Sequence, residues 1–227
     1  MSDLEQLENK LKIHFTNKLL LEQAFVHRSY LNENEFSPGH NERLEFLGDA
    51  VLEMIVTKYL YQKLPDKSEG ELTALRSALV RRETLAEIAS ELDFHNYLKL
   101  SRGEAKTAAN QPAILANTVE AFIGALFLDA GITAARKFLS KHLLPKLDAI
   151  IAAHRHIDAK SHFQELVQER EGLTPTYQVA KESGPDHDKT FEVIVLIGGK
   201  EVARGTGNSK QAAEMDAATT ALAEYPH

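Results

Sequence analysis

One stretch of the chain reads His40-Asn41-Glu42-Arg43-Leu44-Glu45-Phe46-Leu47-Gly48-Asp49-Ala50. If this stretch is helical, its acidic residues Glu42, Glu45 and Asp49 lie on one face of the helix. Glu53, in the next turn, lies on the same face. The opposite face carries the apolar residues at positions 44, 47, 51 and 55. Like charges at this spacing destabilise a helix by about 0.2–0.5 kcal/mol per pair, and no lysine or arginine follows at the i+4 positions. The stripe therefore predicts a cation supplied by a metal or a partner, unless it is simply a solvated acidic face.

The composition is that of an ordinary globular protein. A length of 227 residues allows one large domain or two smaller ones, and 43% of the residues are hydrophobic. The chain has no cysteine, and its N-terminus lacks the residue order of a signal peptide. No apolar run reaches the roughly 18 residues of a membrane span, so we expect a cytoplasmic protein without membrane contact. The net charge of −7 argues against a nucleic-acid partner unless local basic patches override it.

Helical spacing of apolar residues dominates the first two thirds of the chain. The ranges with this pattern are 4–15, 17–31, 41–63, 83–92, 112–128 and 133–152. Another helix is opened by Ser68, because Glu71 completes a capping box with it. Pro112 starts an apolar helix, and Gly131 is placed to stop it. We therefore predict an all-α N-terminal domain over residues 1–152.

Two polar residues interrupt the apolar helix that begins at Pro112. Asn117 and Glu120 lie one turn apart on one face of this helix. A buried carboxylate without a partner costs on the order of several kcal/mol or shifts its pKa strongly, so its presence often marks function. The alternative is that the two side chains form a hydrogen-bonded structural pair.

The pattern changes after residue 158. Helical spacing of apolar residues predicts two helices, over residues 160–171 and 209–223. In three other ranges, apolar and polar residues alternate and β-branched residues are frequent, which predicts strands over 176–180, 190–197 and 200–206. Gly198-Gly199 is placed as a hairpin turn. The order αβββα predicts a small α+β domain over residues 159–225. Residues 153–158 form the predicted linker, where His154 and His156 lack the further ligands that a metal site needs.

Four motifs, in this order, resemble those of a bacterial ribonuclease III. The first runs from His40 to Asp49, and the second is Glu69-Gly70-Glu71-Leu72-Thr73-x-x-Arg76. The third is Ile114-Leu115-Ala116-Asn117-Thr118-Val119-Glu120-Ala121. The fourth lies in the tail, which is similar to a double-stranded-RNA-binding domain. The residues that carry this similarity are Gln164-Glu165, Gly184-Pro185-Asp186-His187 and Gly205-Thr206-Gly207-Asn208-Ser209-Lys210. The resemblance covers nearly the whole chain and implies a helical endonuclease domain followed by an RNA-binding domain.

The resemblance implies a Mg²⁺-dependent endoribonuclease, with Mn²⁺ as a substitute ion. Its metal ligands would be Glu45, Asp49, Asn117 and Glu120, of which Asp49 and Glu120 would be catalytic. Hard cations of this kind take oxygen ligands. Glu42 would support the site from behind the ligands, and Glu69 either extends the acidic site or only places charge at a helix N-terminus. Such an enzyme hydrolyses double-stranded RNA to 5′-phosphate and 3′-hydroxyl ends, in the processing of rRNA and mRNA precursors.

Phe46 indicates a second copy of the chain. It projects near the carboxylate face rather than the core face, and an exposed phenylalanine beside an acidic site is unusual on a monomer. In the family this position packs into the partner subunit, so the resemblance implies a homodimer. Two active sites, one for each strand, would leave short 3′ overhangs.

The tail carries the expected RNA contacts. They are Gln164, Glu165, His187, Lys189, Asn208, Ser209 and Lys210. The last three lie at a helix N-terminus, where free N–H groups and the helix dipole attract phosphate. His187 and Gln164 would face successive minor grooves of A-form RNA. Residues 158–227 nevertheless hold seven Lys/Arg and twelve Asp/Glu, a difference of −5, which is acidic for a domain that binds phosphates.

The chain departs from the family at a metal position. The family usually has aspartate where this chain has Asn117, whose carbonyl oxygen is a neutral ligand. The loop from Lys106 to Ala109 also lacks the paired glycines and the downstream arginine that are common there. The alternative function is therefore a double-stranded-RNA-binding protein of the same fold, with weakened or lost cleavage. A third is an unrelated acidic helical protein that carries an αβββα domain.

Overall fold

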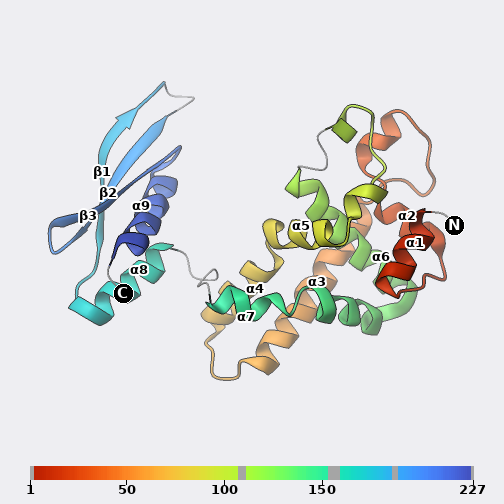
Figure 1. Cartoon of the computed structure of the whole chain (residues 1–227), viewed down its shortest axis with the longest axis horizontal. Coiled ribbons are helices and arrows are strands. Elements are labelled where there is room, and N and C mark those ends of the chain that lie inside the picture. Colours follow the sequence, from red (N-terminus) through yellow and green to blue (C-terminus); the bar gives the residue numbers. More distant parts are fainter. Residues whose placement is uncertain (1–2, 107–110, 153–158, 186–188, 226–227) are drawn as a thin grey trace. The chain divides into compact units, whose positions relative to one another are not determined.

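The computed structural model describes residues 3–106, 111–152, 159–185 and 189–225. The chain divides into two units, residues 1–153 and 154–227, and each is described by itself. The linker predicted for residues 153–158 lies outside the described residues, as does His187. In Figure 1 the first unit is coloured from red to green and the second from cyan to blue.

The first unit consists of helices joined by loops. They are α1 (Asp3–Leu11), α2 (Lys18–Ala24), η1 (Arg28–Asn32), α3 (Glu42–Lys63), α4 (Glu69–Val80), α5 (Arg82–Glu91), η2 (Phe94–Tyr97), η3 (Glu104–Lys106), α6 (Pro112–His142) and α7 (Lys146–Ala152). The longest helix, α6, packs against α3, α5 and α2 and forms the centre of the unit (Figure 1). The prediction of an all-α N-terminal domain is confirmed.

The core is built around Phe122 of α6. Its ring lies 5.7 Å from that of Phe15, in the α1–α2 loop, and 5.2 Å from that of Phe94, in η2. The ring of Phe138, from later in α6, lies 5.0 Å away. Edge-on and tilted pairs at these separations are favourable arrangements for aromatic rings. One side chain thus ties together segments that are far apart in the sequence.

Two glycines let α3 and α6 touch backbone to backbone. A Cβ atom added to Gly48 of α3 would lie 1.8 Å from the carbonyl oxygen of Glu120. A Cβ atom added to Gly124 of α6 would lie 2.2 Å from the carbonyl oxygen of Leu44. No side chain fits at either position, because real Cβ contacts are longer than 3.0 Å. The close crossing brings Asp49 next to the turn of α6 that carries Glu120.

The predicted helix 4–15 is too long. The helix α1 ends at Leu11 because Lys12 takes the left-handed conformation, with φ at 58°. The next N–H then donates to the carbonyl oxygen of Glu8 at 3.0 Å, which closes the helix end in the manner of a Schellman motif. Phe15 is fully buried, so the apolar spacing located a core residue but not the conformation of the backbone around it.

The predicted helix 17–31 is broken in the structure. The helix α2 stops at Ala24, and the following Val26 pairs with Lys99 in an isolated parallel bridge. Residues 28–32 then form the 3₁₀ helix η1. Tertiary hydrogen bonds at the bridge outweigh the local preference for a helix.

The helical geometry of α6 stops at Gly131, where the sequence predicted it. The φ of 76° and ψ of 179° at this glycine are not helical, although helical turns resume beyond it and continue to His142. The predicted range 133–152 is divided a second time, because Pro145 cannot continue a helix and α7 starts only at Lys146.

Among the described helices, only α6 has the length and hydropathy of a membrane span. However, 61% of its most apolar window is buried inside the unit. This burial is that of the central helix of a packed domain.

The second unit has the predicted αβββα order. Its elements are α8 (Ala159–Glu171), β1 (Thr176–Ser183), β2 (Thr190–Ile197), β3 (Lys200–Gly207) and α9 (Lys210–Glu224). The strands form one antiparallel sheet in the order β1-β2-β3, and positive φ angles at Gly198 and Gly199 make the turn between β2 and β3. Alternate residues of β2, from Phe191 to Ile197, are buried together with Phe163 of α8 and the alanines of α9. The predicted α+β fold of the tail is confirmed.

We expect Gly48→Ala to destabilise the first unit by about 3 kcal/mol, since the new Cβ must push α3 and α6 apart. Gly70→Ala is the matched control, because it lies in α4 with no atom within 4 Å of its added Cβ. The control should be neutral or slightly stabilising. Urea unfolding of both variants measures the two effects. Equal midpoints for Gly48→Ala and the wild type would show that the helices do not touch here.

Candidate functional site

The start of α3 is fixed by a buried asparagine. The Asn41 side chain donates to the carbonyl oxygen of Ala24 at 3.2 Å, and its backbone N–H donates to that of Val26 at 2.8 Å. Both acceptors lie at the end of α2. The acidic face of α3 therefore has a set position and rotation relative to the core.

Three carboxylates from two helices interact across the α3–α6 crossing. Burial raises the pKa of Glu120 to about 7, with added contributions from the charges of Asp49 and Glu45. Burial is also the largest cause of the raised pKa of Glu45, followed by the charge of Glu42. The cluster of Glu45, Asp49 and Glu120 thus holds more negative charge than the protein neutralises. It favours the binding of a cation or of protons.

Asn117 is directed at Glu45. Its side chain hydrogen-bonds the Glu45 carboxylate and opposes the effect of burial by lowering the pKa of that group. The amide N–H is the donor, because an ionised carboxylate can only accept. The pKa of Glu120, by contrast, is set by burial and by the two carboxylates of α3. The structure therefore pairs Asn117 with Glu45 rather than with Glu120, and Asn117 orients a carboxylate of the cluster.

The donor set fits a hard divalent cation that keeps much of its water. The cluster offers carboxylate oxygens, and Asn117 has a carbonyl oxygen besides the N–H that it donates. Within residues 3–106, 111–152, 159–185 and 189–225, no three acidic or histidine side chains are arranged to enclose a metal ion. One or two carboxylates suffice for Mg²⁺, which completes its coordination with water. The predicted set of metal ligands, Glu45, Asp49, Asn117 and Glu120, stays a prediction. The surplus of negative charge at the cluster supports it.

Glu42 is partly neutralised by neighbours outside α3. Its carboxylate lies 3.5 Å from Nη1 of Arg28, in η1, and 3.8 Å from Nδ1 of His40. The sequence of α3 does not reveal this basic partner of Glu42, because Arg28 belongs to a different element, η1. Glu42 therefore stands at the edge of the cluster, where its charge raises the pKa of Glu45.

Glu69 does not belong to this cluster. It opens α4 next to the Ser68 cap, where acidic residues stabilise a helix N-terminus. It lines a cleft with Tyr61 and Arg76, and it is not among the charges that shift the pKa of Glu45. The helix-terminus role has a structural basis, whereas the extension of the acidic site by Glu69 remains a prediction.

Most of the RNA contacts predicted for the second unit are exposed on two elements. They are Gln164 and Glu165 on α8, and Asn208, Ser209 and Lys210 at the start of α9. Ser209 caps α9, because its Oγ accepts the N–H of Ala212 at 3.1 Å. The Lys210 ammonium lies 5.8 Å from the centre of the Phe191 ring. The start of α9 thus presents a cation beside free helix N–H groups, which suits a phosphate.

Several other cations of this unit are already paired. The Nζ of Lys189 lies 3.5 Å from Glu182. The guanidinium of Arg204 is bound by Glu192 at 2.7 Å and by Glu201 at 2.6 Å. The acidic composition of the tail is therefore matched by internal ion pairs on the sheet, and few cations remain for a phosphate backbone.

Comparisons with known proteins agree with this geometry. A family model described as ribonuclease-III-like matches residues 17–147, and one for the double-stranded RNA binding motif matches residues 159–225. Ribonuclease 3 of Streptococcus pneumoniae (strain CGSP14) is 45% identical over 218 residues, which cover 95% of this chain and 94% of that protein. The chain belongs to the ribonuclease III family.

Solved structures of a relative resemble this ribonuclease III. One structure of the ribonuclease III nuclease domain from Campylobacter jejuni has a TM-score of 0.58 at 37% identity and covers 63% of this chain and 99% of its own. A second structure of that domain has a TM-score of 0.57 at 38% identity and covers 62% of this chain and 93% of its own. This ribonuclease III is an endoribonuclease, a hydrolase with a helical nuclease domain and a double-stranded-RNA-binding domain.

An exposed apolar strip runs along α3 of this ribonuclease III. Phe46 is 81% exposed, Met54 53% and Tyr61 73%. Phe46 also lines a groove with Leu128 of α6. The sequence prediction singled out Phe46 alone and missed Met54, which lies about two helical turns further along. Large apolar side chains exposed in a row mark an interaction surface.

Without divalent ions, we expect the contribution of Glu120 to the free energy of unfolding of this ribonuclease III to fall as the pH rises from about 5 to about 8. The pKa of Glu120 is about 7 in the folded protein, above its ordinary value of 4.5. In this window the folded state holds a proton that the unfolded state has lost, and the resulting stabilisation disappears above the folded-state pKa. Glu120→Gln should remove this dependence, which amounts to roughly 2–3 kcal/mol.

Urea unfolding in a chelating buffer at both pH values measures the difference. Glu53→Gln is the matched control, because Glu53 is an exposed residue of α3. This control should keep the pH dependence of the wild type. An equal pH dependence in Glu120→Gln and the wild type would contradict the assignment of Glu120 as the partly buried carboxylate that holds the proton.

Proposed function

We propose that this ribonuclease III hydrolyses double-stranded RNA with Mg²⁺, for which Mn²⁺ is a substitute ion. The observation that carries the proposal is the uncompensated cluster of Glu45, Asp49 and Glu120. A divalent cation relieves the repulsion, and an anionic phosphate approaches such a site only after that relief. When bound, Mg²⁺ lowers the pKa of water and offsets the charge on the phosphate and the leaving oxygen.

The chain's own residues have distinct proposed roles. Asp49 and Glu120 are the catalytic residues, because their charges meet across the close crossing of α3 and α6. Glu45 is a further ligand, and the amide of Asn117 holds its carboxylate in place. Arg28 forms an ion pair with Glu42 and offsets part of its charge at the edge of the site. Hydrolysis with this arrangement leaves a 5′ phosphate and a 3′ hydroxyl.

The proposal includes a homodimer that forms through the exposed strip of α3. The Campylobacter jejuni nuclease domain is described as having a region involved in dimer formation. In this chain, Phe46 and the other exposed apolar residues of α3 supply a suitable surface. Two active sites in such a dimer cut both strands and leave short 3′ overhangs. Precursors of rRNA and mRNA in the cytoplasm are the proposed substrates.

A double-stranded-RNA-binding protein without cleavage is the second candidate function, and it rests on Asn117. An asparagine removes one negative charge from the predicted ligand set. The three retained carboxylates favour the enzyme instead. The hydrogen bond from Asn117 to Glu45 also favours it, because the amide keeps the geometry of the site.

We expect Glu120→Gln to reduce cleavage of a long RNA duplex by at least about 100-fold. Loss of a residue that only supports a metal ligand lowers activity by up to about 100-fold, and loss of the ligand itself should lower it at least as much. Binding of the duplex should be unchanged, because the predicted phosphate contacts lie in the second unit. Cleavage with Mg²⁺ or with chelator, and gel shifts without cleavage, measure the two effects. Glu53→Gln is the control and should cleave normally. Normal turnover by Glu120→Gln would rule out the proposed site.

Asn117→Asp should lower the Mg²⁺ concentration required for cleavage by about tenfold, if some 1.4 kcal/mol of the added attraction survives desolvation. Without metal the same substitution should lower the melting temperature. It replaces the donor to Glu45 by a further anion in the cluster.

Mg²⁺ titrations of cleavage and thermal melts in chelator test this substitution. Asn96→Asp, at an exposed position in η2, adds the same charge elsewhere and should change neither measurement. An unchanged Mg²⁺ requirement together with an unchanged melting temperature for Asn117→Asp would place residue 117 away from the metal.

A further inference from the structure

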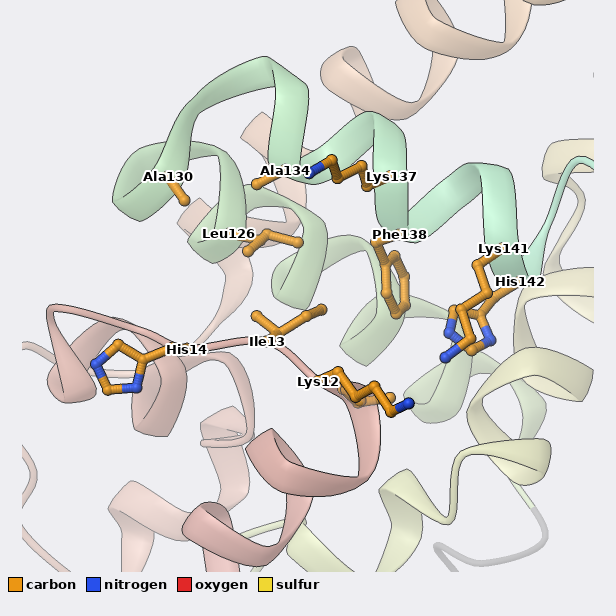
Figure 2. A pocket seen from close by; sticks show the side chains of 11 residues that line it. Lys12, Ile13, His14, Leu126, Ala130, Ala134, Lys137, Phe138, Lys141 and His142 are labelled. Atoms are coloured by element: carbon orange, nitrogen blue, oxygen red, sulfur yellow. The ribbon is translucent and has the colours of Figure 1, made fainter.

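A cavity separate from the acidic cluster opens between the end of α1 and α6. Its volume is about 250 Å³. Figure 2 shows Ile13, Leu126 and Phe138 on its apolar wall. Leu126 and Phe138 are almost fully buried, so the floor of the cavity is part of the domain core. None of the residues assigned to the acidic cluster or to RNA contacts lines this cavity.

The rim of the cavity is basic. Lys12, Lys137 and Lys141 line it, and no acidic side chain among the described residues does so. Within the part of the chain that the structure describes, none of these three ammonium groups forms an ion pair. Glu5 and Glu8 line an adjoining cleft that shares Lys12. The charge of Glu91 acts on His142 at the other end of the cavity, but Glu91 does not line it. A chain with a net charge of −7 thus keeps three lysines unpaired around one apolar opening.

Lys12 occupies a position where glycine is usual. It is the left-handed residue that follows α1, with φ at 58°, and a lysine is strained there relative to glycine. Its side chain lines the cavity, as Figure 2 shows. This conformation belongs to the capped end of α1, and it places the Lys12 side chain at the rim of the cavity.

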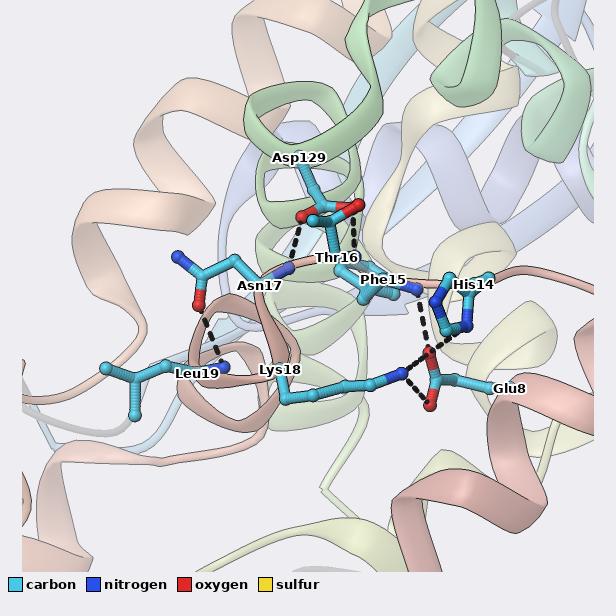
Figure 3. Close-up of polar contacts among 8 residues, drawn as sticks. All are labelled: Glu8, His14, Phe15, Thr16, Asn17, Lys18, Leu19 and Asp129. Atoms are coloured by element: carbon cyan, nitrogen blue, oxygen red, sulfur yellow. Dashed lines mark hydrogen bonds and ion pairs between the residues drawn. The ribbon is translucent and has the colours of Figure 1, made fainter.

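The wall that carries Lys12 is held in place by a buried carboxylate. Glu8 accepts the backbone N–H of Phe15 at 2.7 Å and the ammonium of Lys18 at 2.6 Å (Figure 3). These bonds lower the pKa of Glu8 although burial raises it, so this group stays ionised. The loop after α1 is thereby tied back to α1 itself.

A second carboxylate ties the same loop to α6. Asp129 accepts the backbone N–H of Thr16 at 2.9 Å and that of Asn17 at 2.7 Å (Figure 3). The loop is thus fixed to both helices that border the cavity. The cavity is therefore preformed, as binding sites usually are.

We propose that this cavity docks an acidic segment of a partner protein that inserts one apolar side chain. A volume of 250 Å³ is below the roughly 300–1,000 Å³ of small-molecule sites, but it suits one aromatic or long aliphatic side chain. The three rim lysines complement carboxylates on both sides of that side chain. An apolar anchor in a pocket with a polar rim is the usual arrangement of an energetically dominant contact between proteins.

Duplex RNA is the competing occupant, because three lysines also attract phosphates. The buried apolar floor argues against RNA. A-form RNA presents phosphates and 2′-hydroxyls to a protein, and neither gains from an apolar pocket. A protein segment matches both the floor and the rim.

The test uses the full chain and a fluorescein-labelled peptide that has one phenylalanine between two runs of three glutamates. We expect its anisotropy to rise on binding, and a peptide with alanine in place of the phenylalanine to bind at least about tenfold more weakly. Lys137→Glu should weaken binding of the first peptide about tenfold, because it reverses a rim charge. Arg136→Glu is the matched control, because it reverses the neighbouring charge on α6 and Arg136 does not line the cavity. This control should bind the peptide as the wild type does.

Ala130→Phe gives a second measurement. Ala130 is an exposed residue that lines the cavity, so the larger side chain should fill it and abolish peptide binding, with a melting temperature close to that of the wild type. Equal peptide binding by Lys137→Glu, Ala130→Phe and the wild type would overturn the proposal. So would a lack of binding by the wild type at peptide concentrations up to about 1 mM. Loss of duplex RNA binding in Lys137→Glu with unchanged peptide binding would assign the rim to RNA and also overturn it.

Discussion

The direct contact of the α3 and α6 backbones, at Gly48 and Gly124, is the constraint on which the rest of the nuclease domain depends. It shields Glu120 from water and brings carboxylates of α3 close to it, so that burial first and then the charges of Asp49 and Glu45 raise the pKa of Glu120. It also explains how such a cluster is tolerated. The apolar surface that α6 buries around Phe122 outweighs the repulsion between the carboxylates, so the core holds the site in an unfavourable electrostatic state.

The fold class followed from the sequence because it depends on local patterns. Alternation along residues 190–197 predicts a strand that is buried on one face, and Gly131 interrupts a helix through its own φ angle. The ends of α1 and α2 depend on tertiary contacts instead. The bridge between Val26 and Lys99 joins two segments that no periodicity relates, and it decides where α2 stops.

The candidate site could be predicted as a set of residues but not as a geometry. Helical spacing places Glu45 and Asp49 on one face of α3, and a polar residue in an apolar helix draws attention to Asn117. The hydrogen bond from Asn117 to Glu45 and the ion pair of Glu42 with Arg28 link different elements, so only the folded structure shows them. The lysine-rimmed cavity has no sequence motif at all, because its residues come from the end of α1 and from both parts of α6.

The break at Gly131 means that α6 is not one rigid rod. The part before the break is locked in its crossing with α3 and carries Glu120. The part after it carries Lys137 and Phe138 on the cavity. The second part can therefore tilt relative to the first without displacing a carboxylate of the cluster. One helix thus carries a proposed catalytic residue before the break and two lysines of the proposed docking cavity after it.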